Sequence, residues 1–132
     1  MRDYRLYLAD IAKSVEKIQR YTSGMSFEDF VADERTFDAV VRNLEIIGEA
    51  VLNIPAALRE RYPNVEWQNI GKIRNFLAHG YFKVKESVVW NIASNDVPLL
   101  QSQVSHILES ESSPSSSTDS PTTSIYPKQR GP

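Results

Sequence analysis

Residues 37–54 read F-D-A-V-V-R-N-L-E-I-I-G-E-A-V-L-N-I and form the most regular hydrophobic pattern of the 132-residue chain. Apolar side chains recur there at steps of three and four residues, which is the period of one face of an α-helix. They are Phe37, Val40, Val41, Leu44, Ile47, Val51 and Ile54. The pattern predicts a long amphipathic helix, and Pro55 marks its end because a proline disfavours the helical conformation of the residue before it.

Helical patterns with the same period lie on both sides of this stretch. Asp29 stands three residues after Ser26, at the position where a capping box places an acidic side chain. Further helices are expected at residues 2–22, in a short segment that Ser26 opens, at 56–61, and from Trp67 to a point near Gly80.

A last helix is expected to face inward with Val89, Ile92, Val97, Leu100, Val104 and Ile107. Pro98 lies inside it, so a kink or a short break is expected at residues 95–98. No segment shows the sustained alternation of a half-buried strand. The expected fold class is therefore all-α, an up-and-down helical bundle of about five helices.

Composition changes abruptly near residue 110, where Ser, Thr and Pro become dominant. Such a segment buries too little apolar surface to offset the entropy of ordering. The expected division is a helical domain at residues 1–109 and a disordered tail at 110–132.

Charge and residue content narrow the function classes. The chain has no cysteine and two histidines, so no metal site and no cofactor are expected. No apolar run approaches the roughly 20 residues that span a bilayer, and the N-terminus has no signal-peptide pattern. A cytoplasmic protein without a membrane partner is therefore expected.

Net charge is −2, but the stretch from Arg59 to Lys85 holds six cations against two anions. The cations are Arg59, Arg61, Lys72, Arg74, Lys83 and Lys85, and the anions are Glu60 and Glu66. Such a patch either holds a few phosphates or is an ordinary solvated face. Charge alone favours the solvated face.

The segment with the most distinctive polar chemistry is G-K-I-R-N-F-L-A-H-G-Y at residues 71–81. On a helix, Asn75 and His79 are neighbours that lie away from the apolar stripe, and Arg74 adjoins them. The set suits cleavage of RNA through its own 2′-OH, with His79 moving protons, Arg74 stabilising the phosphoryl oxygens and Asn75 orienting the phosphate or the imidazole. The alternative is a capped helix end with a hydrogen-bonded histidine.

The spacing Arg74, four residues, His79, one residue, Tyr81 resembles the signature of HEPN domains of the HepT toxin family. The stretches at residues 42–50, 73–82 and 96–100 are also similar to characteristic stretches of that family, in the same order. The resemblance covers residues 1 to about 109, everything except the tail.

The resemblance implies the toxin of a type VII toxin–antitoxin system, a metal-independent endoribonuclease that acts as a homodimer with two Arg/His sets in one cleft. It further implies an MNT-type nucleotidyltransferase antitoxin that modifies the motif tyrosine, here Tyr81, with AMP. The substrate is then RNA, with tRNA and mRNA as candidates, and Lys72, Lys83 and Lys85 are the expected RNA-binding cations. The alternative is a non-catalytic HEPN module that binds a nucleotide or a partner protein.

Other polar and aromatic residues have structural interpretations. His106 is expected to point to solvent, and Trp67 and Trp90 to anchor the core or an interface rather than stack on bases. Glu45 and Glu49 are one helical turn apart and form either a polar face or an acidic edge toward a basic segment of a second subunit.

Overall fold

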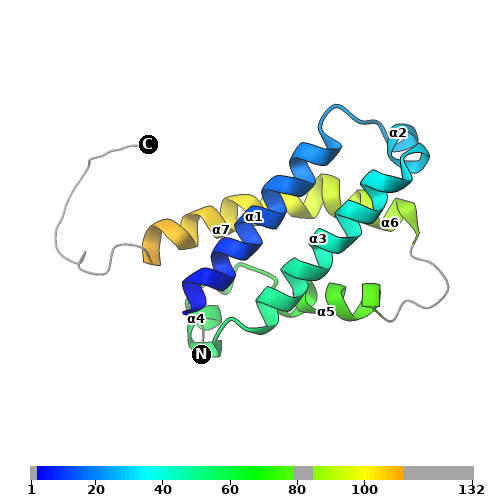
Figure 1. Cartoon of the computed structure of the whole chain (residues 1–132). Helices are drawn as coiled ribbons and strands as arrows, with labels where there is room; N and C mark the ends of the chain where they lie inside the picture. The colour runs from blue at the N-terminus through cyan, green and yellow to red at the C-terminus, as the bar shows by residue number, and fades with distance from the viewer. Residues whose placement is uncertain (1–2, 79–84, 112–132) are drawn as a thin grey trace, which may run out of the picture.

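Four helices of 12 residues or more build the framework of the protein, which the computed structural model describes at residues 3–78 and 85–111 (Figure 1). They are α1 (Tyr4–Thr22), α3 (Glu34–Leu52), α5 (Trp67–Ala78) and α7 (Val97–Glu111). The short elements are α2 (Phe27–Ala32), α4 (Ala56–Arg61), α6 (Glu86–Asn91) and the π-helical turn η1 (Ile92–Asp96). The described residues contain no strand, and the expected all-α bundle is confirmed.

Helix α3 lies at the centre of the bundle, where it packs against α1 on one side and against α5 on the other. Helix α7 also packs against α1. The apolar positions that the sequence pattern assigned to the first helix are all buried: Leu8, Ile11, Val15 and Ile18. Helix α5 packs mainly against α3, and its contacts with the other described helices are much smaller.

Side-chain caps determine where two helices begin. The predicted capping box is present, because the Ser26 hydroxyl accepts from the Asp29 amide at 3.1 Å while the Asp29 carboxylate accepts from the Ser26 amide at 3.1 Å. Helix α3 starts at Glu34, before its apolar pattern begins, because Asp33 caps it. The Asp33 carboxylate accepts from the Thr36 amide at 3.0 Å and from the Thr36 hydroxyl at 2.8 Å.

The break that Pro98 was expected to cause takes the form of a π-helical turn. Residues Ile92–Asp96 form this turn, and Val97 donates its amide to the carbonyl oxygen of Ile92, five residues earlier. Pro98 then lies in the first turn of α7, where a missing amide hydrogen costs least. The chain is thus helical on both sides of the π-helical turn. The irregular turn lies before the proline and not at it.

Glu111 joins three distant parts of the chain and lies two residues beyond the expected domain boundary at 109. Its carboxylate accepts hydrogen bonds from the Tyr4 hydroxyl at 2.9 Å, the Tyr62 hydroxyl at 2.7 Å and the Arg61 guanidinium at 2.8 Å. The Glu111 side chain is only 14% exposed. The end of α7 is therefore tied to the start of α1 and to the segment after α4.

These donors, first of all the Tyr62 hydroxyl, lower the pKa of Glu111 below its ordinary value. A carboxyl whose pKa is lowered by folding stabilises the fold above its unfolded pKa, and this stabilisation is lost as pH falls through the lowered value. Glu111→Gln is therefore expected to lower the free energy of unfolding at neutral pH by about 1.5–3 kcal/mol, the usual value of hydrogen bonds to a charged group.

Urea denaturation at neutral and at acidic pH measures this effect. The difference between the parent and Glu111→Gln should shrink in acid, where Glu111 is protonated in both folded and unfolded chains. Glu60→Gln, which changes an exposed carboxylate on α4, is the control and should have little effect. Equal losses in both variants, or a loss that does not depend on pH, would show that the Glu111 charge does not stabilise the fold.

Candidate functional site

Arg74 lies where α5 crosses α3, opposite Gly48. A Cβ atom placed on Gly48 would lie 2.5 Å from the Arg74 Cβ and 3.0 Å from the Arg74 backbone nitrogen. The two helices can approach this closely only because residue 48 has no side chain. The structure therefore brings the stretch at residues 42–50 into direct contact with the stretch that begins at Ile73.

This position differs in one respect from the one that the sequence pattern predicted for Arg74. The pattern placed Arg74 beside Asn75 on the side of the helix away from the apolar stripe. In the structure the Arg74 Cβ is inside the contact with α3 and the residue is half-buried, whereas Asn75 is exposed. Gly48 is the cause, because any larger residue there would exclude Arg74 from the contact.

The guanidinium of Arg74 reaches out of this contact and donates to the Asn75 side-chain oxygen at 3.2 Å. Within the described residues, none of the ion pairs involves Arg74, so no carboxylate of that part of the chain neutralises its charge. An arginine in this state can donate several hydrogen bonds to the oxygens of a phosphate.

The outer side of α5 carries exposed residues of mixed character. Lys72 and Asn75 are exposed there, and the Phe76 side chain is 50% exposed. Lys85 is also exposed and lies immediately before α6. A cation, an amide and an aromatic ring are thus available to a ligand or a second protein on this side of the bundle.

Three of the predicted site residues, His79, Tyr81 and Lys83, lie outside the described residues. His79 follows directly after Ala78, the last residue of α5, in the sequence. The described part of the candidate site consists of Lys72, Arg74, Asn75 and Lys85.

The structure divides the basic stretch that the sequence suggested. Arg59 donates to the Ile54 carbonyl at 3.1 Å, and Arg61 pairs with Glu111 at 2.8 Å. Both residues belong to α4, which precedes α5, whereas Arg74 lies in the second half of α5. Arg59 and Arg61 therefore take part in contacts that stabilise the fold.

The structural interpretations of His106 and the two tryptophans are confirmed. His106 is exposed, with its ring edge-on to Tyr62 at a centroid distance of 6.2 Å. Trp67 is buried and donates its ring N–H to the Tyr62 carbonyl at 2.9 Å. Trp90 packs on Phe30 at 5.1 Å. Both tryptophan rings are therefore packed against the core.

The two carboxylates of the 42–50 stretch differ in their surroundings. Glu45 pairs with Arg42 on the same helix at 3.6 Å, and its side chain is 29% exposed. Glu49 is exposed. They make a polar face of α3, and the acidic edge toward a second subunit stays a prediction.

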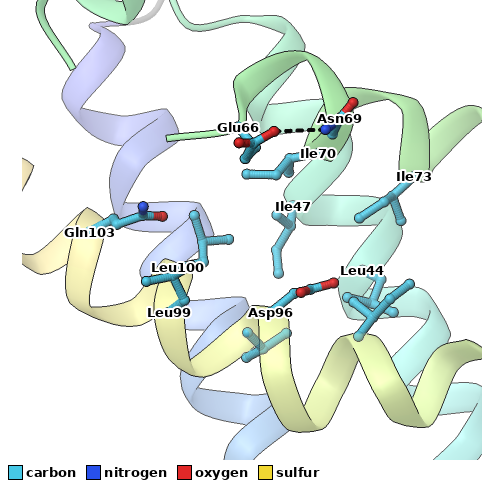
Figure 2. A pocket seen from close by; sticks show the side chains of 12 residues that line it. Leu44, Ile47, Glu66, Asn69, Ile70, Ile73, Asp96, Leu99, Leu100 and Gln103 are labelled. Atoms are coloured by element: carbon cyan, nitrogen blue, oxygen red, sulfur yellow. Dashed lines mark hydrogen bonds between the residues drawn. The ribbon is translucent and has the colours of Figure 1, made fainter. Parts of the chain in front are cut away.

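A groove that the sequence did not predict runs between α5 and the η1–α7 segment, over α3 (Figure 2). Its volume is about 430 Å³. Apolar side chains line most of it, among them Ile70, Ile73 and Leu100, while Glu66 and Asp96 contribute carboxylates. These carboxylates repel phosphate, so the groove does not suit the RNA backbone. Its lining comes from α3, α5 and the η1–α7 segment, which are far apart in the sequence, so the periodicity of single helices cannot predict it.

Two features that the described residues lack bear on the site. Among them, no group of three or more His, Cys, Asp or Glu side chains is placed to hold a metal ion. No helix in this part of the chain is both long enough and apolar enough to cross a membrane.

One protein family and several individual proteins are similar to this chain in sequence. The family described as "Ribonuclease HepT-like" matches residues 11–107. A protein of Thermococcus cleftensis named "Probable ribonuclease HepT" is 41% identical over 100 residues, which cover 76% of this chain and 91% of that protein. Proteins of Caldanaerobacter subterraneus and Methanocaldococcus jannaschii, whose names assign them provisionally as RNases, are 41% and 39% identical.

The Caldanaerobacter match covers 84% of this chain and 99% of the relative, and the Methanocaldococcus match covers 74% and 80%. No solved structure gives a significant match to the chain.

Proposed function

Because the chain belongs to the HepT-like ribonuclease family, we propose that it cleaves RNA without a metal ion, using Arg74, Asn75 and His79. The observation that carries this proposal is the location of the Arg74 guanidinium and its lack of a paired carboxylate among the described residues. The guanidinium lies at the edge of the α3–α5 contact, bonded to Asn75 and paired with no carboxylate of the described residues. A half-buried cation of this kind is ready for an anionic ligand.

The proposed reaction is a transesterification within the RNA. The 2′-oxygen forms a bond to phosphorus and the bond from phosphorus to the 5′-oxygen breaks. The 2′-hydroxyl proton passes to a general base, and the leaving 5′-oxygen takes a proton from a general acid. Negative charge grows on the phosphoryl oxygens in the transition state, where the Arg74 guanidinium stabilises it and Asn75 orients the phosphate.

His79 is the residue proposed to move both protons, since histidine is the side chain whose ordinary pKa lies nearest to neutral pH. One imidazole cannot be base and acid in the same step, so the reaction calls for two of them. We therefore propose a homodimer that joins two Arg74/His79 sets in one cleft. The half-exposed Leu52 on α3 and Phe76 on α5, each 50% exposed, support an interface built from these two helices.

Mixing two kinds of chain tests the shared site. Equal amounts of parent and His79→Ala chain are mixed and allowed to exchange protomers, and the rate is compared with that of the same total amount of parent chain. If both histidines are needed, about one quarter of the rate should remain, because only parent–parent dimers cleave RNA. If each chain acts alone, about one half should remain. Sedimentation velocity on the same samples shows whether the chain is a dimer. A fully active monomer would contradict a site shared by two chains.

The proposal extends to control of the enzyme. The chain would be the toxin of a type VII toxin–antitoxin system, and an MNT-type nucleotidyltransferase antitoxin would attach AMP to Tyr81. Lys72, Lys83 and Lys85 would bind the RNA backbone, and tRNA and mRNA are the candidate substrates. A phosphate group on Tyr81 would add negative charge and bulk next to this site and so repel RNA.

The function itself is tested by incubating the purified full chain with single-stranded RNA in the presence of EDTA. We expect cleavage, and we expect it to vanish in the His79→Ala chain. Cleavage that stops in EDTA and returns with an added divalent metal would contradict the metal-free reaction. A non-catalytic module that binds a nucleotide or a partner protein would leave the RNA intact in every sample.

A further inference from the structure

We propose that Gly48 is a positioning residue for Arg74: the missing side chain at residue 48 sets how closely α5 approaches α3 and thereby where the guanidinium stands. This inference rests on the proposed catalytic role of Arg74. It assigns a function to a residue on a different helix, outside the Arg–His–Tyr segment.

The contact leaves no room for any side chain on Gly48. The nearest atoms to an added Cβ belong to Arg74, namely its Cβ at 2.5 Å, its backbone nitrogen at 3.0 Å and its Cα at 3.1 Å. All three move only with the helix, so a rotation about a side-chain bond cannot relieve the overlap. A residue larger than glycine must therefore push this part of α5 away from α3.

Backbone conformation does not explain the glycine. Gly24, in the turn after α1, is the one glycine of the described residues with a positive φ, whereas Gly48 lies within the regular helix α3. Glycine disfavours a helix interior relative to alanine, so helix formation by itself would favour alanine at residue 48. The close approach of Arg74 is the feature of the structure that requires glycine there.

Gly71, which lies in the same pair of helices, provides a matched comparison. A Cβ on Gly71 would meet the Leu52 Cδ2 at 3.0 Å and the Val51 Cγ1 at 3.9 Å. The nearest atom is the end of a flexible side chain, so a rotation about the side-chain bonds of Leu52 can relieve the overlap. An alanine at residue 71 can therefore be accommodated without moving the backbone of either helix.

Displacement of α5 should affect catalysis more than RNA binding. A misplacement of a catalytic group by about 1 Å can lower a rate by about 100-fold. The guanidinium acts most strongly on the charge that develops in the transition state. A shift of Arg74 should therefore lower kcat while it leaves the affinity for intact RNA nearly unchanged.

The experiment compares Gly48→Ala and Gly71→Ala in the full-length chain. Cleavage of an oligoribonucleotide gives kcat, and the same oligonucleotide with one 2′-deoxy position at the cleavage point, which cannot react, gives Kd. We expect Gly48→Ala to lower kcat by about 10- to 100-fold with a change in Kd of less than about 3-fold. Gly71→Ala should stay within about 2-fold of the parent in both constants. Circular dichroism and urea denaturation give the folded fraction by which each rate is divided.

A second comparison asks whether Gly48 acts through Arg74. In the Arg74→Ala background, Gly48→Ala should lower the rate by a smaller factor than it does in the parent, because the guanidinium that it positions is gone. An equal further loss in that background, equal losses in the two glycine variants, or a Gly48→Ala chain that does not fold would each overturn the positioning role. If the parent itself does not cleave RNA, or if Arg74→Ala cleaves like the parent, the proposed function fails, whatever the glycine variants do.

Discussion

Arg74→Ala and His79→Ala are each expected to give a folded protein that has almost lost RNA cleavage. Removing one group that stabilises the transition-state charge lowers a rate by about 100- to 1,000-fold, and removing a proton-transfer group lowers it by about 100- to 10,000-fold. Arg74→Ala should fold because alanine keeps the Cβ atom that packs against Gly48. The group that it removes is bonded, within the described residues, to the exposed Asn75.

Initial rates on one RNA substrate, together with urea denaturation of each variant, measure this prediction. Arg20→Ala is the matched control, because it removes an exposed cation of α1 that pairs with Glu16, and it should cleave at the parent rate. If a folded Arg74→Ala or His79→Ala chain cleaves RNA at the parent rate, that residue has no part in the chemistry. A loss of activity that merely follows a loss of folded protein would assign the residue to stability.

Neutralisation by the proposed nucleotidyltransferase antitoxin is expected to depend on the Tyr81 hydroxyl. Chain produced together with the nucleotidyltransferase should carry the added mass of AMP on the peptide that contains Tyr81, and it should no longer cleave RNA. The added phosphate places negative charge where the RNA backbone must bind, and so excludes the substrate electrostatically. Mass spectrometry of the intact chain and of its peptides detects the modification.

Tyr81→Phe separates covalent from steric control. The substitution keeps the aromatic ring and removes the oxygen that accepts AMP, so this chain should stay active and toxic in the presence of the antitoxin. Tyr7→Phe, a change to a partly buried tyrosine of α1, is the control and should still be neutralised. Neutralisation of Tyr81→Phe without any change of mass would mean that the antitoxin acts by covering the site.

Local patterns in the sequence were sufficient for most of the fold. Apolar residues three and four positions apart identified the buried side of α1, since every such position up to Ile18 is in the core. The pair Ser26 and Asp29 located the start of α2, because a capping box depends on residues only three positions apart. Pro98 indicated an interruption, although its form as a π-helical turn depends on packing that no local pattern describes.

Contacts between distant residues could not be predicted in this way. Nothing in the periodicity of α3 or α5 specifies which residues meet where the helices cross, so the contact of Gly48 with Arg74 appears only in three dimensions. The same holds for Glu111, which was assigned to the tail because its neighbours in the sequence are serines. Its bonding partners Tyr4 and Tyr62 are 107 and 49 residues away.

For the candidate site, the residue types were more informative than their spacing. Arginine, asparagine and histidine within six residues suggested phosphate chemistry, and the family match now supports that interpretation. The helical projection placed Arg74 next to Asn75, as in the structure. It missed the contact of Arg74 with α3, because a projection of one helix ignores a glycine on the neighbouring helix. A close glycine contact lets a polar residue stand partly inside a helix–helix interface.

The most direct test of the account is the chemical identity of the ends that cleavage leaves. RNA is incubated with the purified chain in EDTA, with the His79→Ala chain in parallel, and the products are analysed by mass spectrometry. Attack by the 2′-oxygen should leave a 2′,3′-cyclic phosphate on one fragment and a 5′-hydroxyl on the other, in the parent sample alone. Fragments that carry a 5′-phosphate, or intact RNA with the parent chain, would contradict the proposed reaction.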